Sequence, residues 1–270
     1  MLWRASNEHP RLCALTYHRD MTSATAPEPT SANVDREPSV DIPNIPLLDE
    51  AIEFRALDVK PTWRGWIHAV TFPTAIILGL VLIALGANPA ARWSSAVFVL
   101  SSLLLFGISA TYHRFNWSER ARVMLKRLDH ANIFLLIAGT YTPLAIMALP
   151  PEKGYLLLVL VWTGALIGIG FRVFWINAPR WAYVPLYVML GWAAVLYIVD
   201  LFNANAAMMV LVIVGGLAYT AGAVVYGLKK PNPVPGVFGF HEIFHTLTVV
   251  AFLCHWTGVL LVALDPPFGG

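Results

Sequence analysis

Three segments of the chain carry histidines and acids at spacings that suit a metal site. In FGFHEIFHTL, His241 and His245 stand four residues apart, so a helix places both on one face. Ser109 and His113 share that spacing in GISATYHRF, and Asp129 opens the segment LDHANIF. Each group stands at one end of a long apolar stretch, where local structure gives no reason for polar residues to recur. We therefore expect the three segments to meet at one depth and form one site.

The predicted chemistry of this site is that of zinc. The imidazoles of His113, His241 and His245 leave a fourth tetrahedral position for water, as in catalytic sites, and zinc lowers the pKa of that water towards about 7. Asp129 could hold and deprotonate the water, while Ser109 could orient an imidazole or donate a hydrogen bond to a developing oxyanion. Copper, nickel and iron also accept imidazole ligands, and zinc is preferred because this ligand set is its habitual catalytic form.

A rival interpretation starts from HEIFH at 241–245, which matches the zinc-protease pattern H-E-x-x-H with Glu242 as general base. It leaves His113 unexplained, and Asp129 is the only well-placed acid that could complete it. Single residues also have simpler interpretations. Ser109 could bond back to its own helix, and Asp129 could pair with Arg114 or Lys126.

The other histidines are weaker candidates. Taken singly, His68, His130 and His255 are typical of interfacial or packing residues. His68 lies at the expected depth but has no partner four residues away, so its role stays open. His255 follows His245 by ten residues, which is about 15 Å along a helix, so it cannot share the same metal. We expect it to pack against other residues or to make a separate polar contact.

The amino-acid composition is that of a membrane protein, so we expect helices in a bilayer to position these residues. Of 270 residues, 57% are hydrophobic and only 13% are charged, against about a quarter charged in soluble domains. The basic residues form no stripe that suggests nucleic acid as a partner. Two cysteines, Cys13 and Cys254, exclude a disulfide framework or a CxxC metal site.

Seven apolar stretches are each near the roughly 20 residues that a helix needs to span a bilayer. Backbone groups in lipid must bond internally, and the stretches are too long for barrel strands, so we predict an all-α integral membrane protein with a seven-transmembrane helix bundle. The predicted spans are 66–86, 93–112, 129–149, 155–175, 182–201, 206–228 and 241–263.

The basic residues that flank these spans predict the orientation. Twelve lie on one side, between Arg55 and Lys230, whereas Arg92 and Lys153 alone lie on the other. By the positive-inside rule the N-terminus is cytoplasmic and the C-terminus is outside. The chain is then a multi-pass protein of the cell (plasma or inner) membrane, with its metal site near the cytoplasmic side.

The transmembrane domain is expected over 66–263, with short flanking parts. Residues 1–45 read as a disordered polar tail without a signal peptide, and Met21 is an alternative start. In 46–65 the apolar spacing favours a helix on the membrane surface, with a solvated linker as the alternative. Residues 264–270 form a short C-terminal tail.

The combination of these motifs resembles the hemolysin III family of the progestin and adipoQ receptor superfamily. The resemblance covers roughly 60–262 and rests on Ser-x-x-x-His at 109–113, the Asp of LDHANIFLLIAGTYTP, and His-x-x-x-His at 241–245. It implies a zinc ion held by His113, His241 and His245, with Asp129 and Ser109 beside the metal-bound water, and an inward-facing N-terminus. The family often has a Glu and an Asn before a histidine in the first span, whereas KPTWRGWIH supplies only His68.

The superfamily also resembles alkaline ceramidases, which implies hydrolysis of a lipid amide. The leading hypothesis is therefore a zinc-dependent membrane hydrolase of a lipid amide or ester, with membrane lipids as partners and a long acyl chain in its substrate. The first alternative is a receptor or lipid-sensing and homeostasis protein with structural zinc. The second is a lytic, pore-forming protein, as the family name implies, although the spans lack a polar stripe that would line a channel.

Overall fold

A computed structural model describes residues 61–175 and 177–269, and apart from one isolated bridge between Val234 and Phe238 their regular structure is helical. The predicted tail 1–45, and 46–60 of the predicted juxtamembrane segment, lie outside the described residues. The elements are α2 (Trp66–Leu85), α3 (Pro89–Arg114), α4 (Glu119–Ala148), α5 (Pro151–Phe174), α6 (Arg180–Gly191), η1 (Ala193–Tyr197), α7 (Ile198–Ala204), α8 (Ala206–Leu228) and α9 (Phe240–Leu264).

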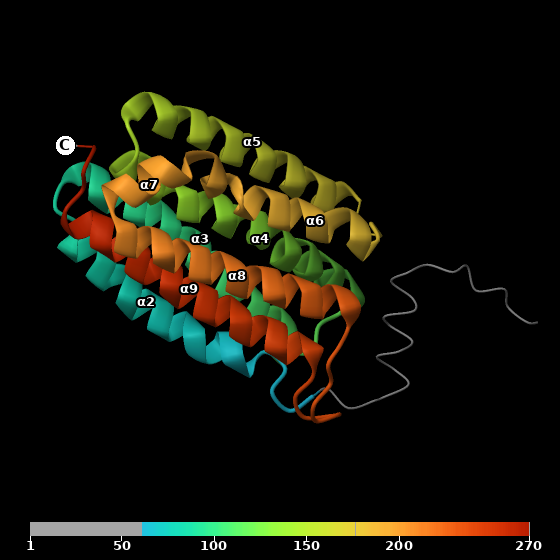
Figure 1. Ribbon diagram of the computed structural model, residues 1–270. Coiled ribbons are helices and arrows are strands. Elements are labelled where there is room, and N and C mark those ends of the chain that lie inside the picture. The colour runs from blue at the N-terminus through green and yellow to red at the C-terminus, as the bar shows by residue number, and fades with distance from the viewer. Residues whose placement is uncertain (1–60, 176, 270) are drawn as a thin grey trace, which may run out of the picture. The chain divides into compact units, whose positions relative to one another are not determined.

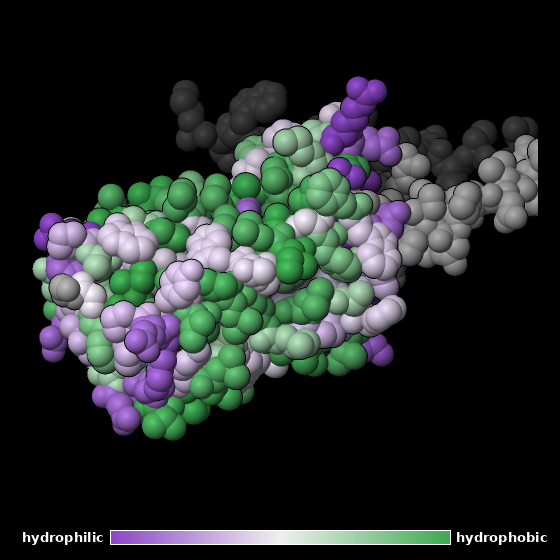
Figure 2. Space-filling view, turned by 90° about the horizontal axis from the view of Figure 1, so that it is seen from above, coloured by the Kyte–Doolittle hydropathy of each residue, from purple (hydrophilic) through white to green (hydrophobic). Residues whose placement is uncertain are grey.

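The described residues contain seven helical spans that are long and apolar enough to cross a membrane, with α6, η1 and α7 forming one span, Arg180–Ala204. Apolar side chains point outward from them: Ile77, Leu80, Leu166 and Leu217 are each more than half exposed. Figure 2 shows hydrophobic side chains over the middle of one face, with hydrophilic groups near its two ends. The prediction of an all-helical, seven-span membrane protein is confirmed.

The central helix of the bundle is α4. In its apolar stretch 78% of the residues are buried, against 22–44% in the other spans. It packs between α3 and α5, α2 packs on α3, and α8 packs on α9 (Figure 1). Because α9 also contacts α2, α3 and α4, the four helices with candidate site residues are neighbours.

The start of α4 corrects one predicted boundary. This helix begins at Glu119, ten residues before the predicted start at 129, so Asp129 does not open it. Its 30 residues extend about 45 Å, longer than the roughly 30 Å hydrocarbon core, so its first turns continue beyond the apolar stretch. Hydropathy marks the membrane boundary rather than the end of the helix.

The fifth span is broken rather than continuous. The helix α6 ends at Gly191, and the hydroxyl of Tyr141 on α4 donates to the Gly191 carbonyl at 2.6 Å and accepts from the Ala194 N–H at 2.8 Å. Trp192 Nε1 donates to Thr220 Oγ1 at 3.0 Å. Irregular backbone inside a membrane is tolerated where protein groups satisfy it, as they do here.

The charge asymmetry of the sequence recurs at the helix ends. The described Lys and Arg residues, apart from two, flank the end where α2, α4 and α9 begin. The two exceptions are Arg92 and Lys153, and Lys153 pairs with Asp200 at 2.7 Å. Which end faces the cytoplasm stays a prediction.

Candidate metal centre

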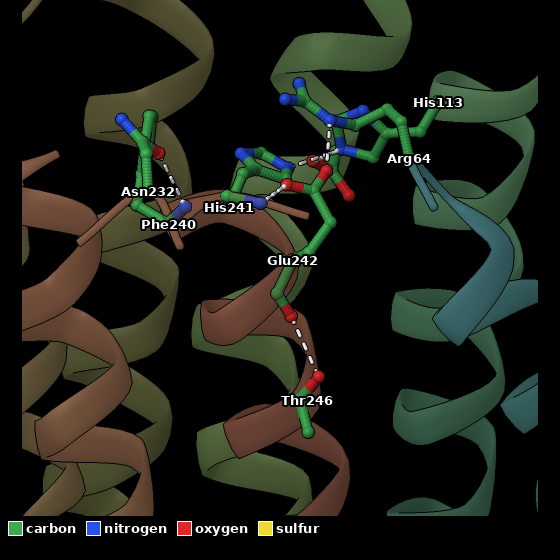
Figure 3. Close-up of polar contacts among 9 residues, drawn as sticks. Arg64, His113, Asn232, Phe240, His241, Glu242 and Thr246 are labelled. Atoms are coloured by element: carbon green, nitrogen blue, oxygen red, sulfur yellow. Dashed lines mark hydrogen bonds and ion pairs between the residues drawn. The ribbon is translucent and has the colours of Figure 1, made fainter. Parts of the chain in front are cut away.

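The three predicted histidines meet where α3 ends and α9 begins. His113 is the last residue but one of α3, and His241 and His245 lie on successive turns at the start of α9. One ring nitrogen from each lies within 4.8 Å of the others, and the Nε2 atoms of His113 and His241 are 3.2 Å apart. Figure 3 shows the rings of His113 and His241 turned toward each other from these two helices.

This spacing suits a metal ion. Two nitrogens bound tetrahedrally to zinc at about 2.0–2.1 Å lie roughly 3.3 Å apart. The observed 3.2 Å matches that edge, and His113 and His245 are 9% and 3% exposed, which leaves little water to solvate their nitrogens. The donor set therefore fits zinc, while the presence of a metal stays a prediction.

Asp129 and Ser109 lie beside this cluster. Asp129 Oδ2 on α4 is 3.7 Å from His113 Nε2, too far for a hydrogen bond. The Ser109 side chain on α3, which is 2% exposed, makes a hydrogen bond with the Asp129 carboxyl group. The structure therefore brings together all five residues predicted for the site.

The carboxylate of Glu242 is engaged in structural contacts, whereas a general base needs an oxygen that is free to accept a proton. Its Oε1 accepts from Arg64 Nε at 2.7 Å, and its Oε2 accepts from the Gly239 backbone N–H at 2.9 Å, which caps α9 (Figure 3). Both carboxylate oxygens are thus occupied in a side chain that is 2% exposed. The H-E-x-x-H interpretation lacks a free base at this position.

The residues Gly65 and His68, at the start of α2, lie against the three histidines, a contact that the sequence analysis did not predict. The ring of His68 stacks on that of His245, with centroids 3.8 Å apart and an interplanar angle of 2°. Just before it, Gly65 has φ 77°, and a Cβ there would lie 2.8 Å from His113 Cβ. Only glycine fits so closely. The signal was available in KPTWRGWIH as a glycine and a histidine at one depth.

The two remaining described histidines make contacts of their own. His255 Nε2 lies 3.2 Å from the Val212 carbonyl oxygen, so the expected separate polar contact is confirmed. His130 Nδ1 lies 2.6 Å from an Arg172 nitrogen. Neither belongs to the group of three.

A cavity extends from the cluster into the bundle. Its walls at the cluster include Ser109, Asp129 and His245, and it reaches as far as Leu144 and His255. The lining of this cavity is mostly apolar. Such a space suits a ligand with one polar end and a long apolar part.

Comparison with known proteins points to one family of membrane proteins. Residues 58–256 match the family model described as "Haemolysin-III related". The chain is 30% identical to the hemolysin-3 homolog of Bacillus subtilis over 209 residues, which cover 74% of this chain and 95% of the relative. It is also 30% identical to hemolysin-3 of Bacillus cereus over 61% of this chain and 75% of the relative. A rice relative, heptahelical transmembrane protein ADIPOR2, is 30% identical over 64% of this chain and 83% of its own length.

Proposed function

The chain belongs to the haemolysin-III related family of membrane proteins, and from this premise we propose that it is a zinc-dependent hydrolase of a lipid amide or ester. The observation that carries the proposal is the convergence of His113, His241 and His245 beside Asp129, at the wall of an apolar cavity. A receptor could use the same cavity, so the role of the Asp129 carboxylate in turnover is what distinguishes the two functions.

The three histidines would hold the zinc ion through one ring nitrogen each. When bound, the ion supplies a Lewis acid that activates water and polarises a carbonyl group. The carboxylate of Asp129 accepts a proton from water on the cavity side of His113. Ser109 holds that carboxylate toward the cluster through its hydrogen bond. The apolar wall of the cavity binds the acyl chain and keeps other water away.

The substrate class follows from the surroundings of the site. A protein with seven apolar spans is surrounded by membrane lipids, and the lining of its cavity is mostly apolar. A lipid is therefore the substrate class that we propose. We place the protein in the cell membrane with its site toward the cytoplasm, because the basic residues flank the site's end of the bundle.

The test combines metal content with turnover. Wild type purified in detergent should contain about one zinc per chain by elemental mass spectrometry, and the triple change His113→Ala, His241→Ala and His245→Ala should contain none. A panel of fluorescent lipid amides and esters then identifies the substrate. Asp129→Asn should keep its zinc and lose turnover by roughly 10²–10⁴-fold, the usual contribution of a general base.

Asp265→Asn at the far end of α9 is the matched control and should behave as wild type. Wild-type turnover in zinc-loaded Asp129→Asn would overturn the proposed role of Asp129, and wild type without zinc would overturn the metal. Dye release from liposomes that is equal in wild type and Asp129→Asn would instead favour the lytic activity that the name of the Bacillus cereus relative suggests.

A further inference from the structure

A further histidine borders the cavity far from the candidate metal centre. His255 lines this cavity and is 9% exposed. It follows His245 by ten residues on α9, which places it about 15 Å deeper in the bundle. Because the lining of the cavity is mostly apolar, a polar side chain at that depth requires a physical explanation.

The contact with α8 fixes which nitrogen of His255 carries a proton. His255 Nε2 lies 3.2 Å from the Val212 carbonyl oxygen. A carbonyl oxygen only accepts hydrogen bonds, so Nε2 is the protonated donor. Burial in an apolar bundle favours the uncharged ring, which carries a single N–H. The other nitrogen, Nδ1, therefore presents a lone pair that can accept a hydrogen bond.

This acceptor, His255 Nδ1, is buried and has no hydrogen-bond partner among the described residues. The opposite edge of the ring, Cδ2 and Nε2, lies so close to α8 that a Cβ on Gly215 would overlap it. Gly215 is outside the cavity lining, whereas its neighbours Val212, Gly216 and Tyr219 belong to it. The acceptor is thus on the edge of the ring that is turned away from Gly215, in a side chain that borders the cavity.

A role in helix packing alone leaves this acceptor unexplained. The next residue, Trp256, joins α9 to α2 by donating from Nε1 to the Leu78 carbonyl oxygen at 3.0 Å. Tryptophan has one donor and no acceptor, so its bond leaves no polar atom unpaired. His255 makes the same kind of bond to Val212 but keeps a buried, unpaired Nδ1, which destabilises the fold. A ligand that donates to Nδ1 would remove this cost.

We propose that His255 forms a second polar subsite of the cavity, where Nδ1 accepts a hydrogen bond from a hydroxyl group on the apolar part of a bound lipid. A hydroxyl brings a donor without a charge, and without the carbonyl acceptor that accompanies an amide N–H. His255 is about 15 Å from His245 along α9, so this hydroxyl lies well along the chain. The inference rests on the proposed function for the orientation of the lipid, and it narrows the substrate class to hydroxylated lipids.

The test compares lipids that differ only in this hydroxyl. Stearic acid competes with a fluorescent fatty acid for the detergent-purified protein, as do hydroxystearic acids with the hydroxyl beside the carboxyl group, at mid-chain or towards the far end. Fatty acids are products of the proposed hydrolysis, and their carboxylate replaces the substrate carbonyl near the three histidines. A hydroxyl at mid-chain or beyond should lower Kd by roughly fivefold to tenfold relative to stearic acid, as expected for one added hydrogen bond.

Replacing His255 by leucine should reverse this preference. His255→Leu removes the acceptor, so stearic acid should bind roughly fivefold more tightly than the hydroxylated chain, whose hydroxyl is then buried without a partner. Leu144→Ala is the matched control, because it changes the same deep wall without a polar atom and should leave the ratio of the two Kd values as in wild type. Equal Kd values for stearic acid and every hydroxystearic acid in wild type would overturn the subsite, as would a preference that persists in His255→Leu.

A spectroscopic measurement covers the case in which His255→Leu does not fold. In wild type labelled with ¹⁵N-histidine, the signals of His255 are identified by their loss in His255→Gln. The preferred hydroxystearic acid should move the signal of an unprotonated Nδ1, and stearic acid should leave it nearly unchanged. A protonated Nδ1 in the free protein, or identical shifts with both lipids, would overturn the subsite. None of these measurements needs turnover, so a failure to hydrolyse any lipid would defeat the proposed function while binding still decides the role of His255.

Discussion

Replacing Glu242 by glutamine separates the two enzyme interpretations. Glutamine keeps an oxygen that can accept the Gly239 N–H, so the cap of α9 survives, but it loses the charge that faces Arg64. A hydrogen bond between charged groups contributes about 1.5–3 kcal/mol, and breaking a fully buried ion pair costs about 3–5 kcal/mol. Because the Arg64 side chain is 18% exposed and can regain water, we expect Glu242→Gln to lower the free energy of unfolding by about 2 kcal/mol.

Glu242→Ala should lower it by about 1 kcal/mol more, because the helix cap is lost as well. The assay is an equilibrium unfolding titration in mixed detergent and dodecyl sulfate micelles, with turnover and zinc content measured on the same preparations. Glu152→Gln is the matched control, since Glu152 is an exposed acid in the first turn of α5 and should change stability by less than about 0.5 kcal/mol.

The same substitution can refute the assignment of Glu242 as a structural residue. We expect zinc-loaded Glu242→Gln to hydrolyse lipid at close to the wild-type rate below its unfolding transition. An unchanged unfolding titration together with lost turnover would show that Glu242 is the base, as the H-E-x-x-H interpretation requires. In an Arg64→Met background the destabilisation by Glu242→Gln should shrink, since the ion pair is already broken.

Two further substitutions test the packing around the centre. Gly139→Ala should destabilise the bundle by about 1–3 kcal/mol, because the new Cβ would overlap Ser101 Oγ and push α3 away from α4. Gly170→Ala, whose Cβ would meet nothing within 4 Å, is its control in the same unfolding titration, and equal effects would contradict this reasoning. His255→Leu should retain the full zinc content by elemental mass spectrometry, because His255 faces the Val212 carbonyl; loss of the metal would place His255 in the site.

The spans and the pairing of histidines were predictable because both depend on local rules. Span length follows from bilayer thickness, and the spacing of His241 and His245 follows from the helical period. The meeting of His113 with the α9 pair followed from depth alone, since helix ends on one side of a membrane lie at one level. The start of α4 was missed because a helix does not end where lipid ends.

Contacts that depend on helix packing were not predictable. His130 and Arg172 are 42 residues apart, and nothing in either segment indicates that α4 and α5 approach closely enough to join them. The stacking of His68 on His245 likewise depends on how α2 packs against α9. The break of the fifth span at Gly191 is satisfied by Tyr141, a residue 50 positions earlier, so its stability is encoded outside the span.

If the proposed function holds, the polarity of the cavity restricts how a lipid would lie in it. Its end at the three histidines offers Ser109, Asp129 and His130, whereas further into the bundle its walls include Leu144 and Val212. A lipid bound with its polar part inward would bury oxygens against these apolar side chains, at a cost of roughly 1–3 kcal/mol for each unpaired group. The opposite orientation places the acyl chain among them and the carbonyl near the histidines. The lining is mostly apolar, and its acid, Asp129, stands beside the three histidines, so the cavity favours a ligand whose polar part lies toward the histidines.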